Sequence, residues 1–209
     1  MHLPADNLSA APGGLMETVE PIRSLEKLEQ IEDYLRRRSE RDYMLFVTGC
    51  ATGLRISDLR RLRVVDVRDK THLVVRTKKT GKRVMILVTD HLAAAFRSYT
   101  NGKEDNDYLF ASRKGWNQPL SRGAFYQILR QAAAACGVHR IGTHSMRKTF
   151  GWHFYQQTKD VAQLQELLGH QHPSVTLRYI GVVQDDLDQA MKRFSIHGRG
   201  RLSQQYASN

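Results

Sequence analysis

Side chains that act on phosphate esters recur in one order along this sequence. They combine cationic, imidazole and phenolic groups: Arg55, Lys79, His144, Arg147, His170 and Tyr179. Guanidinium groups bind two phosphate oxygens at once, imidazole and ammonium groups move protons, and a phenol can attack phosphorus. Paired carboxylates do not accompany the set, which argues against metal-dependent phosphoryl transfer. The residue types therefore predict a phosphate-binding site without a metal or another cofactor.

Two of the candidates stand in the motif His-Ser-Met-Arg. The spacing of His144 and Arg147 places both on one face of a helix, where one phosphate can meet an imidazole and a guanidinium. Spacing alone, however, favours an ordinary basic surface helix. Arg55 follows a Thr-Gly-Leu turn at an expected helix start, a position that attracts anions. It can equally pair with Asp58, and the two interpretations are compatible.

His170 ends the motif Leu-Leu-Gly-His, where a histidine can simply complement the helix dipole. Together with His172 it forms a His-x-His pair, but no third residue with metal-ligand spacing follows nearby. The chain has eight tyrosines, and most stand in packing contexts or in the tail. Only Tyr179 follows the Gly-His motif through a Pro-Ser-Val-Thr helix start. A phenol there needs a cationic pocket, because its ordinary pKa near 10 keeps it protonated.

Composition points to a polyanionic partner. The 209 residues carry a formal net charge of +11, which favours a polyanionic partner, with nucleic acid as the default candidate, over a merely basic soluble protein with scattered lysines. Neither a transmembrane run nor a signal peptide is evident. Cys50 and Cys136 are best interpreted as free thiols in a reducing cytoplasm. One catalytic domain in the cytoplasm is therefore expected.

Periodicity predicts a mainly α fold with one small antiparallel β-sheet, an α+β class. Helices are expected from Ser24, over 40–51, 57–63, after a cap at Asp90, from Ser121 to Gly137, from a cap at Thr143 to Gln157, from Asp160 to Gly169, from Pro173, and over 185–194. Extended runs at 71–77 and 83–89 flank a Gly-containing turn and predict a hairpin. Residues 1–21 are expected to be a flexible leader, 22–195 the domain, and 196–209 a basic polar tail.

Four segments in this order resemble one known family: ATGLRISDLRRL (51–62), RTKKTGKRVMI (76–86), GTHSMRKTF (142–150) and LLGHQHPSVTLRYIGV (167–182). Together they are similar to the catalytic domain of the tyrosine recombinases, the phage integrase family. The resemblance covers 22–190 and implies the tyrosine recombinase catalytic-domain fold.

The resemblance also implies a role for each candidate. Arg55 and Arg147 would bind the scissile phosphate, and His170 would donate a hydrogen bond to it. His144 would transfer the proton of Tyr179, which would attack phosphorus and form a 3′-phosphotyrosyl link. A hairpin lysine would protonate the leaving 5′ oxygen.

The identity of that lysine and one neighbouring position are less regular. The Lys-Thr-Gly pattern favours Lys79, with Lys78 as the alternative, although lysines at a turn are commonly just solvated. At the position of Asp58 the family most often has glutamate. The expected 185–194 helix can pack on its own domain or, as in the family, on a neighbouring protomer.

The resemblance implies a site-specific DNA recombinase or integrase that needs no metal or ATP. It would act as a homo-tetramer on DNA through a Holliday junction, and can be a monomer in free solution. Two other functions share this set of residues, a type IB topoisomerase and a non-catalytic DNA-binding regulator. Family members usually carry an N-terminal DNA-clamping domain, which suggests either an excised catalytic domain or a minimal recombinase.

Overall fold

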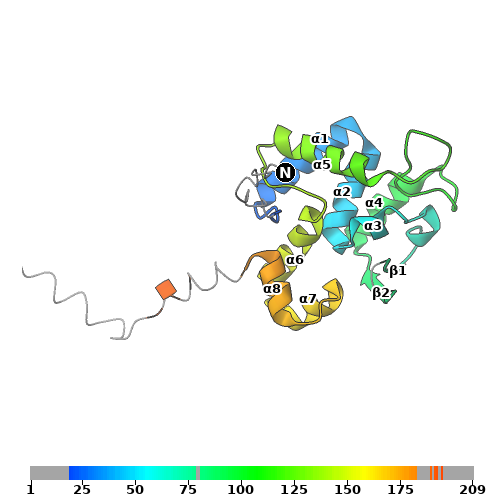
Figure 1. Cartoon of the computed structure of the whole chain (residues 1–209). Coiled ribbons are helices and arrows are strands. Elements are labelled where there is room, and N and C mark those ends of the chain that lie inside the picture. Colours follow the sequence, from blue (N-terminus) through cyan, green and yellow to red (C-terminus); the bar gives the residue numbers. More distant parts are fainter. Residues whose placement is uncertain (1–18, 79–80, 183–188, 190, 193, 195–209) are drawn as a thin grey trace, which may run out of the picture.

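A computed structural model describes residues 19–78, 81–182, 189, 191–192 and 194. The helices are α1 (Leu25–Arg38), α2 (Glu40–Thr52), α3 (Ile56–Leu59), α4 (Asp90–Thr100), α5 (Arg122–Ala135), α6 (Ser145–Thr158), α7 (Val161–Leu168) and α8 (Pro173–Ile180) (Figure 1). The strands are β1 (His72–Arg76) and β2 (Arg83–Leu87), and a short 3-10 turn spans Val64–Asp66. This architecture confirms the expected mainly α fold with a small antiparallel sheet.

Short polar side chains start most of the helices. The hydroxyls of Ser24, Ser39, Thr89 and Ser121 and the carboxylate of Asp160 each accept a backbone N–H from the first turn of the following helix. Two expected caps are wrong by one residue. Thr89 caps α4 in place of Asp90, and His144 occupies the cap position of α6 in place of Thr143.

The helix expected over 57–63 is shorter than its sequence pattern indicates. Helix α3 contains only 4 residues, and the chain then tightens into the 3-10 turn. The carboxylate of Asp66 accepts the backbone N–H of Arg63 at 2.8 Å, which holds the start of that turn. The side chain of Arg63 lies over the ring of Tyr108 at 4.3 Å. The chain therefore leaves the α-helix after Leu59, and Asp66 holds the start of the 3-10 turn that follows.

The β1–β2 hairpin covers one side of the core with one face and leaves the other face open. Leu73 pairs with Ile86 in register, and both are buried, whereas Val74 and Met85 form an exposed pair. This alternation follows from the two-residue period of a strand. The hairpin is thus fixed to the domain along its inner face, and its two strands lie beside the helices (Figure 1).

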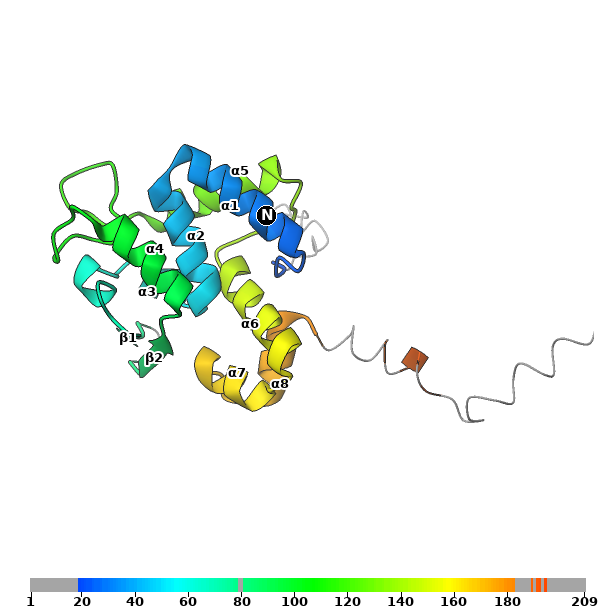
Figure 2. The ribbon, with the colours of Figure 1, turned by 180° about the vertical axis from the view of Figure 1, so that it is seen from behind.

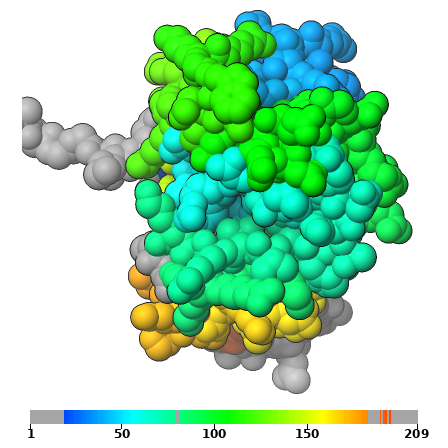
Figure 3. All heavy atoms as spheres, turned by 90° about the vertical axis from the view of Figure 1, so that its right-hand side faces the viewer, coloured from blue at the N-terminus to red at the C-terminus, as the bar shows by residue number. Residues whose placement is uncertain are grey.

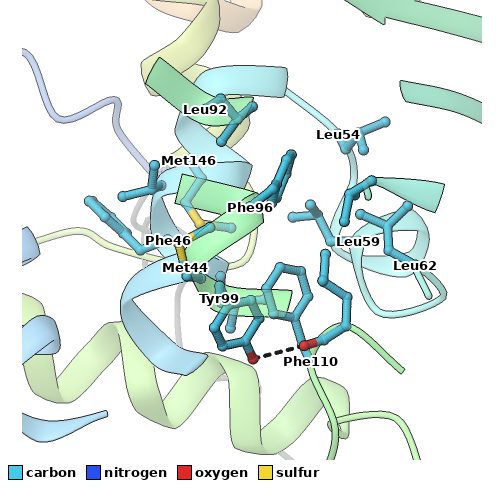
Figure 4. Packing of buried hydrophobic residues seen from close by; sticks show 14 of the residues in the cluster. Met44, Phe46, Leu54, Leu59, Leu62, Leu92, Phe96, Tyr99, Phe110 and Met146 are labelled. Atoms are coloured by element: carbon cyan, nitrogen blue, oxygen red, sulfur yellow. Dashed lines mark hydrogen bonds between the residues drawn. The ribbon is translucent and has the colours of Figure 1, made fainter. Parts of the chain in front are cut away.

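Two apolar clusters organise the helices. The larger surrounds α2 and α4, where Phe46, Phe96 and Phe110 are buried and the Tyr99 hydroxyl donates to the Leu109 carbonyl at 2.8 Å (Figure 4). The smaller cluster joins α6, α7 and α8, which lie together away from α1 and α5 in both ribbon views (Figures 1 and 2). Helix α6 packs against α2 as well as α7 and α8, so it connects the two clusters.

The last residues of the expected leader belong to the domain. Val19 and Glu20 are hydrogen-bonded to α6, Glu20 also to the Arg140 loop, and Pro21 is buried. Residues 1–18, most of the expected 185–194 helix and the whole of the expected tail at 196–209 lie outside the described residues. Within the described part, no helix is long and apolar enough to cross a membrane.

Candidate active site

Five of the six candidate residues come from separate elements that meet around α6. Arg55 precedes α3, His144 and Arg147 stand at the start of α6, His170 follows α7, and Tyr179 lies on α8. Lys79, the sixth, lies outside the described residues. The start of α6 lies at the junction of α2, α7 and α8, because Arg147 bonds to the ends of α2 and α7 and His144 lies next to Tyr179 of α8. The arrangement brings cations, imidazoles and a phenol to one region.

Arg147 is the buried centre of this region, with 6% of its surface exposed. Its guanidinium donates to the carbonyls of Gly53 and Leu168, at the C-terminal ends of α2 and α7. Burial, and then the neighbouring charge of Arg55, lower the pKa of Arg147 to about 10, which leaves it positively charged at neutral pH. Arg147 therefore contributes a fixed charge and also fastens two helix ends together.

His144 and Tyr179 face each other across the α6–α8 junction. The Nδ1 atom of His144 lies 3.3 Å from the Tyr179 hydroxyl oxygen, and the two rings meet edge to face. Partial burial lowers the pKa of His144, and the positive charges of Arg147 and Lys148 lower it further. The imidazole is therefore neutral at pH 7, and with Nδ1 unprotonated it can accept the phenolic proton.

Tyr179 does not gain acidity from this environment. Burial raises the pKa of its phenol, and the charges of Arg147 and Arg55 offset that rise only in part. Arg147 and Arg55 place positive charge near the phenol, but the hydroxyl remains protonated at neutral pH. A proton acceptor is therefore needed when the phenol attacks, and His144 is placed to be that acceptor.

His170 is oriented by the same helix that carries Tyr179. Its Nδ1 lies 3.0 Å from the Thr176 hydroxyl, and its ring centre lies 5.1 Å from that of Tyr179. Gly169, with φ of 59°, ends α7 and turns the chain so that His170 faces α8. His172 is instead the cap residue of α8. Among the described residues, no cluster of His, Cys, Asp and Glu side chains could hold a metal ion.

Asp58 does not pair with Arg55 among the ion pairs of the described residues. One carboxylate oxygen instead accepts the backbone N–H of Lys78 at 2.9 Å, and the carboxylate is buried. The charge of Asp58 also raises the pKa of Arg147. Asp58 therefore links α3 to the hairpin tip, directly before Lys79. This link is found in place of the pairing with Arg55 that the sequence allowed.

A cavity of about 890 Å³ opens between the hairpin and α7. Site residues Arg55, Asp58, Arg147 and His170 contribute to its wall, and Lys82 is among the hairpin residues that also line it. Figure 3 shows this side of the molecule, with the hairpin in teal above α7 in yellow. The cavity gives an anion direct access to the two arginines from the hairpin side.

Two residues near Tyr179 were missed by the sequence reasoning. The Lys148 ammonium lies 5.3 Å from the centre of the Tyr179 ring, and Thr176 holds His170. Both stand inside motifs that had been singled out, next to Arg147 and three residues before Tyr179. Their proximity to a candidate residue was visible in the sequence, but the direction of their side chains was not.

The model of the phage integrase family matches residues 24–185, most of the chain. The chain belongs to the phage integrase family. The membership makes it an enzyme of the tyrosine recombinase type and agrees with the resemblance carried by the four sequence motifs.

Curated relatives of this phage integrase family member are named recombinases. The protein named probable integrase/recombinase YoeC of Bacillus subtilis (strain 168) is 49% identical over 179 residues, which cover 86% of this chain and 98% of YoeC. Tyrosine recombinase XerA of Pyrococcus furiosus is 29% identical over 174 residues, which cover 82% of this chain and 60% of XerA. The chain thus spans nearly all of one relative and only part of the other.

Solved structures of integrases and recombinases share the fold. The crystal structure of XerA recombinase superposes with a TM-score of 0.68 at 21% identity, covering 88% of this chain and 67% of that one. The crystal structure of a lambda integrase dimer bound to a COC' core site superposes with a TM-score of 0.64 at 21% identity, covering 79% of this chain and 49% of that one. These likenesses confirm the tyrosine recombinase catalytic-domain fold for the chain.

Proposed function

We propose that this chain cleaves and rejoins double-stranded DNA at specific sites through a covalent 3′-phosphotyrosyl intermediate on Tyr179. The observation that carries the proposal is the 3.3 Å approach of His144 Nδ1 to the Tyr179 hydroxyl, beside two arginines. A phenol, a neutral base and fixed positive charges are what in-line attack on a phosphodiester requires.

In the proposed reaction the Tyr179 oxygen bonds to phosphorus while the bond from phosphorus to the 5′ oxygen breaks. His144 takes the phenolic proton, and Lys79 gives a proton to the leaving 5′ oxygen. Arg55, Arg147 and His170 stabilise the charge on the non-bridging oxygens. A 5′ hydroxyl of a partner duplex then reverses these steps, and the phosphodiester energy is retained without ATP.

No step in this scheme needs a metal, because the arginines supply the positive charge that a metal would otherwise provide. We expect cleavage to continue in excess EDTA. Assembly as a homo-tetramer around a Holliday junction belongs to the same proposal. It is supported by family membership, and the lambda integrase structure is described as a dimer bound to its core site.

The test is a covalent trap on a nicked duplex, which loses a short 5′ hydroxyl fragment after cleavage and so accumulates the adduct. We expect the wild type to form a denaturation-resistant adduct and Tyr179→Phe to form none. Tyr126→Phe, the same change on α5, is the matched control and should react normally. An undiminished adduct with Tyr179→Phe would move the nucleophile elsewhere, and no adduct with the wild type would support the non-catalytic regulator.

A further inference from the structure

Residues 19–23, here called the strap, run across α6 and reach the end of α8. The carbonyl of Val19 accepts from Lys148 Nζ at 2.7 Å, and the carbonyl of Glu20 accepts from the Ser145 hydroxyl at 3.1 Å. The ribbon seen from behind shows this start of the described chain, in blue, beside α6 (Figure 2). The strap therefore lies on the helix that presents His144 and Arg147.

The middle of the strap is fixed by buried contacts. The backbone N–H of Ile22 donates to the Thr149 hydroxyl at 2.8 Å, and the Ile22 carbonyl lies 3.0 Å from His153 Nε2. Ile22 and Thr149 are almost fully buried. Glu20 also pairs with Arg140, and the carboxylate oxygen lies 2.6 Å from the guanidinium. Because unpaired buried groups are costly, these bonds give the strap one defined position.

The far end of the strap touches the helix of the nucleophile. Arg23 Nη2 donates to the carbonyl of Gly181 at 3.1 Å. Gly181 ends α8 with φ of 76°, and a Cβ there would lie 3.2 Å from the Arg23 guanidinium. A cation at this carbonyl complements the negative end of the α8 dipole. Arg23 thus holds the backbone two residues after Tyr179.

Lys148 connects the strap to the phenol by a second route. Its ammonium is fixed by the Val19 carbonyl and lies 5.3 Å from the centre of the Tyr179 ring. A cation at this distance from an aromatic face is attracted to the ring. The strap therefore contacts the α8 end through Arg23 and the Tyr179 ring through Lys148.

We infer that the strap positions Tyr179 for attack, with Arg23 as the principal positioning residue. None of the strap side chains meets the reacting atoms. The Tyr179 hydroxyl must stay aligned with both His144 and the phosphorus, and a displacement of about 1 Å can cost about 10²-fold in rate. The inference rests on the proposed function in taking Tyr179 as the nucleophile.

The first test measures single-turnover adduct formation on nicked duplex DNA over a range of protein concentrations. We expect Arg23→Ala to lower the maximal rate by about 10- to 100-fold and to leave the half-saturating concentration nearly unchanged. Arg23→Lys should restore much of the rate, because an ammonium can still donate to the Gly181 carbonyl. Arg37→Ala, an exposed arginine on α1, is the matched control.

A second variant separates positioning from loss of charge. Thr149→Val keeps the shape of the side chain but removes the acceptor for the Ile22 N–H, so it loosens the strap without changing charge. It should also lower the maximal rate. If both Arg23→Ala and Thr149→Val match Arg37→Ala, or if Arg23→Ala changes only the half-saturating concentration, the inference is overturned.

A third measurement decides the inference even if the chain forms no adduct. Carbon-13 labelling of the tyrosine rings gives NMR signals, and the Tyr179→Phe spectrum identifies the one from Tyr179. We expect Arg23→Ala and Thr149→Val to shift or broaden this signal, and Arg37→Ala to leave it unchanged. An unaltered Tyr179 signal in the strap variants would contradict positioning, whereas a missing adduct with altered signals would contradict only the proposed function.

Discussion

The environments of Tyr179 and His144 give the two side chains different protonation states, and these fit different roles in the proposed attack. Burial keeps the phenol protonated, while partial burial and neighbouring cations keep the imidazole neutral. The phenol can then transfer its proton only at the moment of attack, over a distance of 3.3 Å. Tyr179 is therefore not deprotonated before the attack, and the reaction depends on the protonation state of His144.

The rate should therefore depend on pH through His144. Its pKa lies below the ordinary value of 6.5, so the neutral form is lost only as pH falls through that lowered pKa. We expect the second-order rate constant of adduct formation to be level near neutral pH and to fall on acidification with a midpoint below pH 6.5. The measurement is the adduct yield with time at subsaturating protein over a pH series.

His144→Gln is the control for this profile, because it keeps a polar side chain that cannot titrate. It should lower the rate and remove the acidic limb. A limb with its midpoint above pH 6.5, or one that survives in His144→Gln, would assign the pH dependence to another group.

At the scale of elements, the hairpin is tied to the rest of the site through Asp58. Its carboxylate accepts the Lys78 N–H at 2.9 Å, so α3 fixes the backbone directly before Lys79. Arg55 stands at the other end of the same short helix. Helix α3 thus connects Arg55, which we propose binds the phosphate, with the backbone next to the proposed acid.

Removing the hydrogen bond between Asp58 and the Lys78 N–H should impair protonation of the leaving 5′ oxygen in the proposed reaction. We expect Asp58→Ala to slow cleavage by about 10²-fold, the lower range for loss of a general acid, and Asp58→Asn to do less harm because an amide oxygen still accepts the N–H. A substrate with sulfur at the bridging 5′ position should restore the rate, since a thiolate leaves without a proton. Asp33→Ala on the exposed face of α1 is the control.

Lack of rescue by the sulfur substrate would show that Asp58 acts on Arg147 and not on the hairpin. The same substrate identifies the hairpin lysine. Lys79→Ala should be rescued and Lys78→Ala should need no rescue.

Helices α6 and α8 pack closely at Gly151. A Cβ at Gly151 would lie 2.7 Å from Cγ2 of Ile180, the neighbour of Tyr179. We expect Gly151→Ala to push α8 outward, to destabilise the fold by about 1–3 kcal/mol and to slow adduct formation. Urea denaturation and the covalent trap measure the two effects.

Gly123→Ala on α5 is the matched control, because the nearest side-chain atom lies 4.0 Å from the added Cβ. Alanine favours a helix over glycine by up to about 1 kcal/mol, so this variant should be as stable as the wild type or more so. Equal urea midpoints for Gly151→Ala and the wild type would contradict the proposed tight packing.

At the scale of the whole molecule, the net charge of +11 governs the encounter with DNA. We expect the DNA association constant to fall at least about tenfold between 50 and 200 mM salt, through release of counterions from the phosphates. Arg55→Ala should reduce the slope of log affinity against log salt by about one. Filter binding or fluorescence anisotropy at several salt concentrations measures both quantities.

Arg36→Ala is the control for this slope, because Arg36 is engaged with Tyr43 and Asp33 on α1. It should leave the slope near the wild-type value. Affinity that does not change with salt would contradict a phosphate-based interface.

The sequence by itself determined the family and most of the elements. Four short motifs, which contain Arg55, His144, Arg147, His170 and Tyr179, occur in the order of the family and identified it. Each motif is a run of adjacent residues, so it can be recognised without the structure. The helix starts at Ser24, Ser121 and Asp160 were equally local, because a capping side chain bonds to the backbone of its own first turn.

Only the tertiary structure decided which partner each of these groups has. The sequence allowed Asp58 to pair with Arg55, but Asp58 bonds to the hairpin, and Arg147 is held by carbonyls far away in the chain. Residues 19–21 of the strap were expected to belong to a flexible leader, yet the carbonyls of Val19 and Glu20 accept hydrogen bonds from α6. Long-range partners depend on how packed helices bring distant residues together, and no local pattern records that geometry.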